Sequence, residues 1–341
     1  MRLNKKNIER CKSLEIGFSN DGHEMKMRVD KLSIVLDVMS ETEQYDYLSR
    51  KFMIMPKSTW RKYKVGSIKR TRPNNPYKMF FTISKGSNML AHISFKPSRK
   101  NTGAIRLDLR PQYMTGKGMD NFINWLNQRL NGRLIPLLGT AWVTQVDVAL
   151  DLYGCKLKDY IWGARGVSEY NSYNTVDGLP GIRLGSLRSP RHMGVYEKVD
   201  INGSGLHFND DSEFLDIDID KYPSFLRIEA RVRPCAKPGS KRKKALMLKK
   251  LDLMPNPFEY LQVYSTKLEA HLNVYKSIWN KPKNNTIKAY KEFTLGGVKK
   301  QRISRKIESI IKKHEVQLFD RDEIWEWWGE CVKRLGVLVE K

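Results

Sequence analysis

Two acidic residues within one apolar segment could act together in chemistry. In VTQVDVALD, Asp147 and Asp151 fall on the same face of a predicted strand, because strand side chains alternate between faces. Carboxylate oxygens are the ligands that Mg²⁺ and Mn²⁺ prefer, so this pair could hold a divalent metal. A solvated sheet face, or an ion pair with arginine, would explain the same pattern without catalysis.

Two more acidic residues lie between arginines. In LRIEARVR, Glu229 has Arg227 and Arg231 two positions away on either side, and Asp108 has a similar context in IRLDLRP. Ion pairs along a wet sheet face account for both segments structurally. Metal binding is the functional alternative, with Asp147 and Glu229 as the leading ligands and Asp151 and Asp108 as weaker candidates.

Tyr196 is the candidate nucleophile and shares a strand face with Lys198 in RHMGVYEKVD. A tyrosine hydroxyl holds its proton with a pKa near 10, so it needs a cation nearby, which a divalent metal assisted by Lys198 could supply. Acids from two strands, a metal and this tyrosine would make a phosphodiester-transfer site. Tyr170 and Tyr173, in a predicted loop, are alternative nucleophiles, and His192 is either a supporting group or a turn residue.

The overall charge favours a polyanionic partner. The 341 residues include 62 Lys and Arg against 37 Asp and Glu, a net charge of +25, while 40% of the residues are hydrophobic. This composition predicts a folded, cationic protein, and DNA or RNA is the commonest intracellular polyanion. An anionic membrane is the rival partner, but no apolar stretch approaches the roughly 20 residues that span a bilayer and no apolar signal core is present. We therefore expect a cytoplasmic protein.

Four basic segments could contact phosphates, with aromatic residues interspersed that could stack on unpaired bases. The segments are 67–78, 96–103, 237–244 and 296–313, and the aromatic residues include Trp60, Tyr63 and Tyr77. The tryptophans of IWEWWGECVKRLGVL recur at helical intervals and favour a packed helix or a partner-docking stripe. Cys11, Cys155, Cys235 and Cys331 form no CxxC pair, which indicates reduced structural thiols.

Alternation and turn residues predict an α+β fold of antiparallel sheets packed with helices. Expected strands are 28–38, 78–84, 88–95, 104–110, 142–154, 181–189, 191–199 and 225–234, with helices at 40–52, 119–130 and 255–268. The similar endings AIRLDLRP and LRIEARVRP suggest two pseudo-repeated halves, each a β-meander with a helix, around strand 142–154; chance similarity is the alternative. We expect one domain over 1–280 and a separate basic α-helical region over 281–341.

The order of VDKLSIVLDV, VTQVDVALDLYG, GIRLGSLRSPRHMGVYEKVD and FLRIEARVRP resembles the replication initiation factor family, the rolling-circle initiators of plasmids and filamentous phages. The resemblance spans about residues 28–235. It implies a replication-initiator nuclease domain over 1–280, with a divergent, HUH-like rolling-circle initiator nuclease fold, Tyr196 as the nucleophile and Asp147 and Glu229 at the metal. The His-hydrophobic-His pair of the better-known initiators is absent from the sequence.

The resemblance implies site-specific nicking and rejoining of a DNA strand through a 5′-phosphotyrosine intermediate. Its implied partners are origin DNA, single-stranded or supercoiled, and a host helicase and polymerase in a bacterial cytoplasm. A homodimer is one assembly state left open. The functional alternative is a non-catalytic nucleic-acid-binding regulator that keeps the scaffold for its charge.

Overall fold

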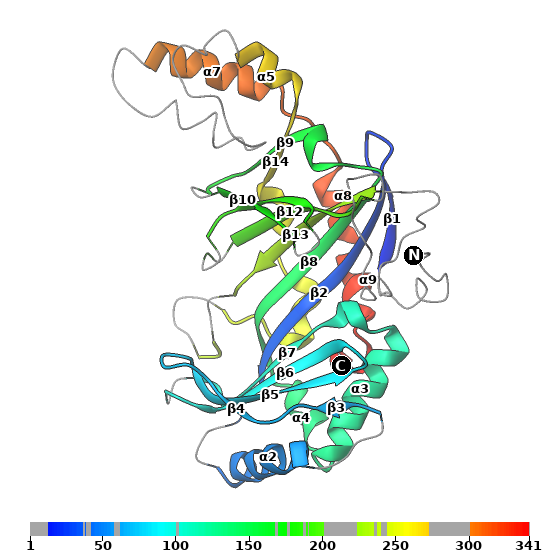
Figure 1. Ribbon diagram of the computed structural model, residues 1–341, viewed down its shortest axis with the longest axis vertical. Helices are drawn as coiled ribbons and strands as arrows, with labels where there is room; N and C mark the ends of the chain where they lie inside the picture. Colours follow the sequence, from blue (N-terminus) through cyan, green and yellow to red (C-terminus); the bar gives the residue numbers. More distant parts are fainter. Residues whose placement is uncertain are drawn as a thin grey trace.

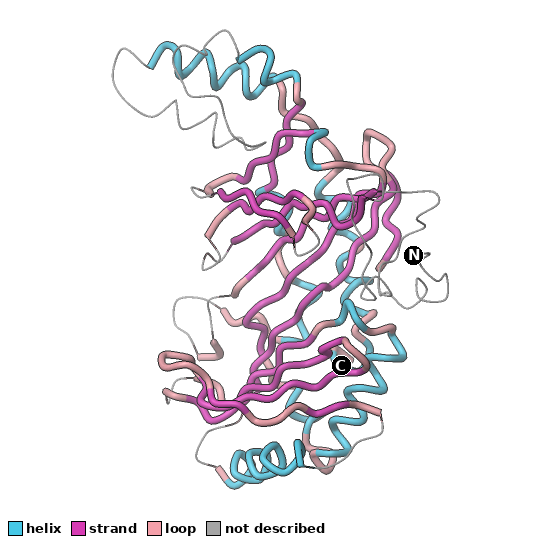
Figure 2. Tube along the Cα trace, in the orientation of Figure 1, coloured by secondary structure: helices cyan, strands magenta, loops and turns pink. Residues whose placement is uncertain are grey.

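A large antiparallel sheet dominates the molecule (Figures 1 and 2). In a computed structural model of the chain, the described residues are 13–36, 38, 42–57, 62–99, 102–167, 170–175, 178–186, 189, 191–200, 224–234, 237–239, 244–272 and 301–340. The predicted domain boundary near residue 281, together with Cys11, Trp60 and Cys235, lies outside them.

The strands confirm the predicted α+β class. In chain order they are β1 (Leu14–Phe18), β2 (Glu24–Leu36), β3 (Lys64–Val65), β4 (Lys69–Arg70), β5 (Tyr77–Lys85), β6 (Asn88–Pro97), β7 (Ile105–Leu109), β8 (Trp142–Tyr153), β9 (Tyr160–Ala164), β10 (Tyr170–Asn174), β11 (Pro180–Leu184), β12 (Arg191–Asp200), β13 (Ser224–Val232) and β14 (Leu261–Ser265). Within the described residues, β9 and β14 form a separate pair and the other strands form one sheet.

The strand order agrees with the predicted pseudo-repeat. The sheet runs β10-β11-β12-β13-β8-β2-β7-β6-β5-β3, so the long strands β8 and β2 lie side by side at its centre. The meander β5-β6-β7 continues from β2 and the meander β11-β12-β13 ends on β8 (Figure 1). Each half thus contributes three meander strands and one central strand.

Helices pack on the apolar face of the sheet, except for two that lie beside each other at one end of the molecule, α5 (Lys267–Leu272) and α7 (Gln301–Lys313) (Figure 1). Those on the sheet are α2 (Glu43–Ile54), α3 (Gly116–Arg129), α4 (Leu134–Leu138), α8 (Arg321–Glu326) and α9 (Trp328–Lys333), with short 3₁₀ turns that include η3 (Leu157–Asp159), η5 (Leu248–Leu253) and η6 (Pro257–Tyr260). Helix α9 contacts β2, and η5 contacts β8. Val146, Val148 and Leu150 of β8 are fully buried on this side. No helix in the described part of the chain is long and apolar enough to cross a membrane.

The C-terminal helices share the core of the sheet. Trp328 is 1% exposed, stacks on Trp325 and donates its indole N–H to the carbonyl of Leu251 at 2.8 Å. The Cys331 thiol faces the carbonyl of Met27 in β2 at 3.5 Å. The packed-helix interpretation of this tryptophan stripe is therefore confirmed. Cys155 and Cys331 are both buried and free of disulfides.

Three local predictions were wrong. Residues 255–268 form η6, β14 and the start of α5 instead of one helix, because Pro255 and Pro257 disfavour a helix and LQVYS pairs with β9. Residues 170–174 form strand β10, paired with β11, instead of a loop. Tyr63 and Tyr77, expected to be available for base stacking, are each 3% exposed, and Tyr63 packs against Phe122 and Trp125 of α3.

Candidate functional site

The site lies on the polar face of four neighbouring strands, β12, β13, β8 and β2. Antiparallel pairing aligns residues of adjacent strands, and side chains of alternate residues point to the same face. Three rows of paired residues cross these strands: His192–Arg231–Asp147–Lys31, Gly194–Glu229–Ala149–Arg28 and Tyr196–Arg227–Asp151–Lys26. The sheet therefore gathers residues that are far apart in the sequence.

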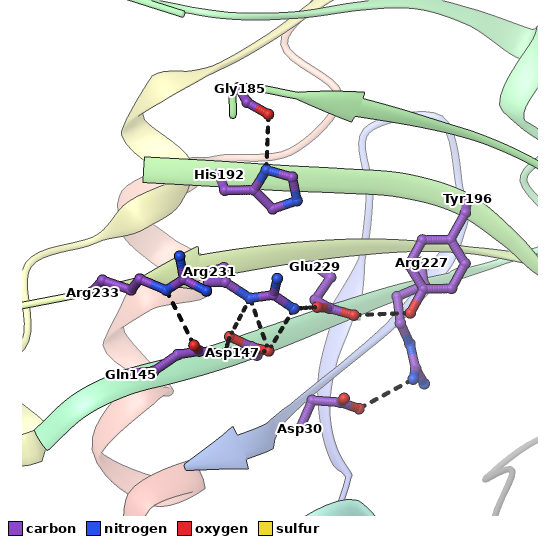
Figure 3. Close-up of polar contacts among 10 residues, drawn as sticks. All are labelled: Asp30, Gln145, Asp147, Gly185, His192, Tyr196, Arg227, Glu229, Arg231 and Arg233. Carbon is purple, nitrogen blue, oxygen red and sulfur yellow. Dashed lines mark hydrogen bonds and ion pairs between the residues drawn. The ribbon is translucent and has the colours of Figure 1, made fainter. Parts of the chain in front are cut away.

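Tyr196 and Glu229 make direct contact. The Tyr196 hydroxyl donates to Glu229 Oε2 at 3.0 Å, and both side chains are partly accessible (Figure 3). Burial, followed by the charge of Glu229, raises the pKa of Tyr196 well above 10. Burial and the nearby Asp30 and Asp147 carboxylates raise the pKa of Glu229 to about 7. The phenol is therefore protonated at neutral pH and is held on an oxygen that can accept its proton.

Arg231 joins Glu229 to Asp147. Its Nη2 lies 3.1 Å from Glu229 Oε1 and 2.9 Å from Asp147 Oδ2, and its Nε donates to Asp147 Oδ1 at 3.0 Å. Gln145 Nε2 also donates to Asp147, at 3.0 Å, and Asp147 is 2% exposed. The two leading candidate acids therefore lie on either side of one guanidinium (Figure 3).

Asp151 is paired with Arg227 in the sheet. Arg227 Nε and Nη2 donate to the two carboxylate oxygens of Asp151 at 2.6 and 2.8 Å, and Nη1 donates to Asp30 Oδ1 at 3.2 Å. Burial alone would raise the pKa of Asp151, but the charge and hydrogen bonds of Arg227 lower it. Both partners of this bidentate pair are almost fully buried. Asp151 therefore forms an ion pair with an arginine, which was the structural alternative to metal binding.

Lys198 lies close to these charges. Burial, then the charge of Arg227, lowers the pKa of Lys198, while Asp30 and Asp151 act in the opposite direction. Lys198 was predicted to share a strand face with Tyr196. The charged groups that shift its pKa, Arg227, Asp30 and Asp151, lie on that face. The Lys198 ammonium group is therefore close to both arginine and aspartate side chains.

Asp108 is on the same face but farther along the sheet. It lies on β7, where Arg106 Nε donates to Asp108 Oδ1 at 2.8 Å and His92 lies 3.6 Å from Oδ2. Burial alone would raise the pKa of Asp108, whereas the nearby His92 ring and the charge of Arg106 lower it strongly. Strands β2, β8 and β13 follow one another between β7 and Tyr196 on β12, so Asp108 is not part of the Tyr196 cluster.

The alternative residues also have definite places. Tyr173, on β10, has its ring centroid 6.5 Å from that of Tyr196, whereas Tyr170 is at the opposite end of the same strand. His192 lies within β12 instead of in a turn, with Nδ1 3.0 Å from the carbonyl oxygen of Gly185. Glycine at 181 allows the tyrosines to approach, because a Cβ there would lie 2.7 Å from Tyr173 Cζ and 2.8 Å from Tyr196 Cβ.

Sequence reasoning missed two charged residues of this face, Arg28 and Asp30. Both lie in β2, where the register shifts between Val29 and Lys31 and the Asp30 carboxylate reaches Arg227. Both are buried, with exposures of 3% and 8%. The signal was present in EMKMRVDKLSIVL, where charged residues alternate with apolar ones before the apolar end of the strand.

The carboxylates as they lie do not fit the predicted Mg²⁺ or Mn²⁺ site. Guanidinium groups occupy both oxygens of Asp147 and of Asp151, and Glu229 is shared between Arg231 and Tyr196. Among the described residues, no three His, Cys, Asp or Glu side chains are grouped to hold a metal ion. Metal binding would require at least one arginine to move away.

Comparison with known proteins gives a likeness among solved structures. No family model matches the sequence, and no curated protein does. Among solved structures, the chain is similar to a rolling circle replication initiator protein from Geobacillus stearothermophilus, with 16% sequence identity and a TM-score of 0.33. The similarity covers 61% of this chain and 74% of that one. A likeness at this TM-score assigns no function to this chain.

Proposed function

We propose that the protein nicks and rejoins a DNA strand through Tyr196, as an initiator of rolling-circle replication. The observation that carries the proposal is the hydrogen bond from the Tyr196 hydroxyl to Glu229 Oε2, beside the guanidinium groups of Arg227 and Arg231. The net charge of +25 and the resemblance of the sequence segments to the replication initiation factor family support it. The proposed partners are origin DNA and, from the resemblance, a host helicase and polymerase.

The chemistry follows from the positions of these groups. Tyr196 Oη attacks the phosphorus of a phosphodiester while its proton passes to Glu229 Oε2. The Oη–P bond forms, the bond from phosphorus to the 3′ oxygen breaks, and that oxygen takes a proton from solvent. The products are a 5′-phosphotyrosine and a free 3′-OH that can prime synthesis. The reverse reaction rejoins the strand.

A covalent adduct assay tests the proposal. The full chain is incubated with supercoiled and with single-stranded DNA that flanks its own coding sequence, once with Mn²⁺ and once with EDTA. Protein–DNA adducts that survive denaturation are quantified, and the modified residue is located by mass spectrometry. We expect an adduct at Tyr196 that Tyr196→Phe abolishes and Tyr173→Phe retains. Equal yield from Tyr196→Phe would eliminate this nucleophile.

A regulator that binds nucleic acid without cutting it is the second candidate function. It is favoured by the arginine pairs of Asp147 and Asp151, which satisfy these acids without any reaction. Salt-dependent DNA binding with no adduct on either form of the DNA, with or without Mn²⁺, would support it.

A further inference from the structure

Arg28 is a buried cation with unused hydrogen-bond donors. It is 3% exposed, and its Nε and Nη1 have no hydrogen-bond partner among the residues that the structure describes. Its Nε lies 3.7 Å from Asp30 Oδ1, beyond hydrogen-bond distance, and that oxygen already accepts from Arg227. A buried guanidinium with two unpaired donor groups costs stability, so its presence calls for a ligand or a compensating role.

The residues around Arg28 carry charges of both signs, and the nearby carboxylates already have other partners. Arg28, Arg227 and Lys198 face two carboxylates, Asp30 and Asp151, and influence one another electrostatically. Asp151 is occupied by its bidentate contact with Arg227. An anion at Arg28 would supply acceptors for its unpaired Nε and Nη1 donors.

Arg28 lies in the same row of paired residues as Glu229, the partner of Tyr196. Arg28 pairs with Ala149, which pairs with Glu229, which pairs with Gly194. The small side chains at 149 and 194 flank Glu229, and the Tyr196 ring lies 3.6 Å from where a Cβ on Gly194 would be. A group held by Arg28 would therefore lie on the same face as the Tyr196 hydroxyl, at the level of its partner Glu229.

We propose that Arg28 binds a phosphate group of the nucleic acid strand on which Tyr196 acts. The arginine supplies a planar set of donors and a permanent positive charge, both of which suit a phosphate. This inference rests on the proposed function for the identity of the strand. The phosphate contact itself does not depend on cleavage.

The salt dependence of binding tests this contact. Each phosphate neutralised on a single strand contributes about 0.7 to the slope of log affinity against log salt. A mixed-sequence single-stranded oligonucleotide is titrated by fluorescence anisotropy at several salt concentrations, with every protein carrying Tyr196→Phe so that no covalent bond can form. We expect Arg28→Met to make the slope about 0.7 shallower, and Arg28→Lys to keep most of it.

Arg106→Met is the matched control, because Arg106 lies on the same sheet but already donates to Asp108 at 2.8 Å. We expect it to keep the parent slope. An unchanged slope in Arg28→Met, or an equal loss in Arg106→Met, would overturn the proposal. If Arg28→Met does not fold, Arg28→Gln replaces it and is judged by the same slope.

The two proposals can fail separately. An adduct at Tyr196 with an unchanged Arg28 slope would overturn the phosphate contact and leave the nicking activity. A slope change without any adduct would keep the phosphate contact and remove the activity.

Discussion

At the scale of single residues, Glu229 connects the tyrosine to the arginine network. One of its oxygens accepts from the Tyr196 hydroxyl and the other from Arg231, which also binds Asp147. Carboxylates that lie close together repel one another, and a cation between them stabilises their charged forms. The arginine that stabilises these acids therefore also occupies the oxygens that a metal ion would need.

Removing Arg231 should therefore favour metal binding. We expect Mn²⁺ to bind the wild-type protein weakly and Arg231→Met about tenfold more tightly, because the loss of one charge–charge contact is worth about 1.4 kcal/mol or more. Isothermal titration with MnCl₂ measures both affinities, and Arg106→Met serves as the control. Tight binding to the wild-type protein, unchanged in Arg231→Met, would show that the acids can hold a metal despite their arginines.

At the scale of elements, the packing of β10 and β11 positions Tyr196. Gly181 of β11 lies opposite Tyr196 of β12 and Tyr173 of β10, and the space at its α-carbon is filled by their side chains. Any larger residue at 181 must displace an aromatic ring or a strand.

We expect Gly181→Ala to lower the yield of the Tyr196 adduct by about tenfold to a hundredfold, because small displacements of a reacting group cost that much. Gly329→Ala is the control, since no heavy atom lies within 4 Å of a Cβ at that position. Both variants are assayed for adduct and for thermal midpoint. A Gly181→Ala protein with full adduct yield would mean that Tyr196 tolerates the displacement.

Alternation and charge predicted much of this architecture. The alternation of VTQVDVALD correctly put Asp147 and Asp151 on one face, and the residues of β13 correctly put Glu229 beside Arg231. Which acid would contact Tyr196 could not be predicted, because it depends on the register between β12 and β13. Arg28 and Asp30 were missed for a similar reason, since β2 joins β8 only through long-range pairing and a register shift.

At the scale of the whole molecule, one hydrophobic cluster joins the sheet to the C-terminal helices. Residues of β2, β8 and α3 belong to it, as do Trp328, Val332 and Leu335. The basic helix α7 lies apart from this cluster, beside α5 at one end of the molecule (Figure 1).

We expect Trp328→Ala to destabilise the entire molecule by about 3–5 kcal/mol, because it leaves a cavity in the core and removes the indole hydrogen bond to the Leu251 carbonyl. Thermal unfolding should remain a single transition at a lower midpoint. Trp327→Ala is the control, since Trp327 is 42% exposed. If the helices instead melt in a separate, earlier transition while the sheet keeps its midpoint, the C-terminal region would be an independent domain.

The central pairing of β2 with β8 also affects how the chain folds during its synthesis. Thr144 of β8 donates to the carbonyl of Ser33 in β2, 111 residues earlier. On the ribosome, β2 therefore emerges long before its neighbour and has an unpaired edge until then. Such late closure slows folding and leaves the nascent chain open to aggregation, so this protein should depend on chaperones during synthesis more than its size alone suggests.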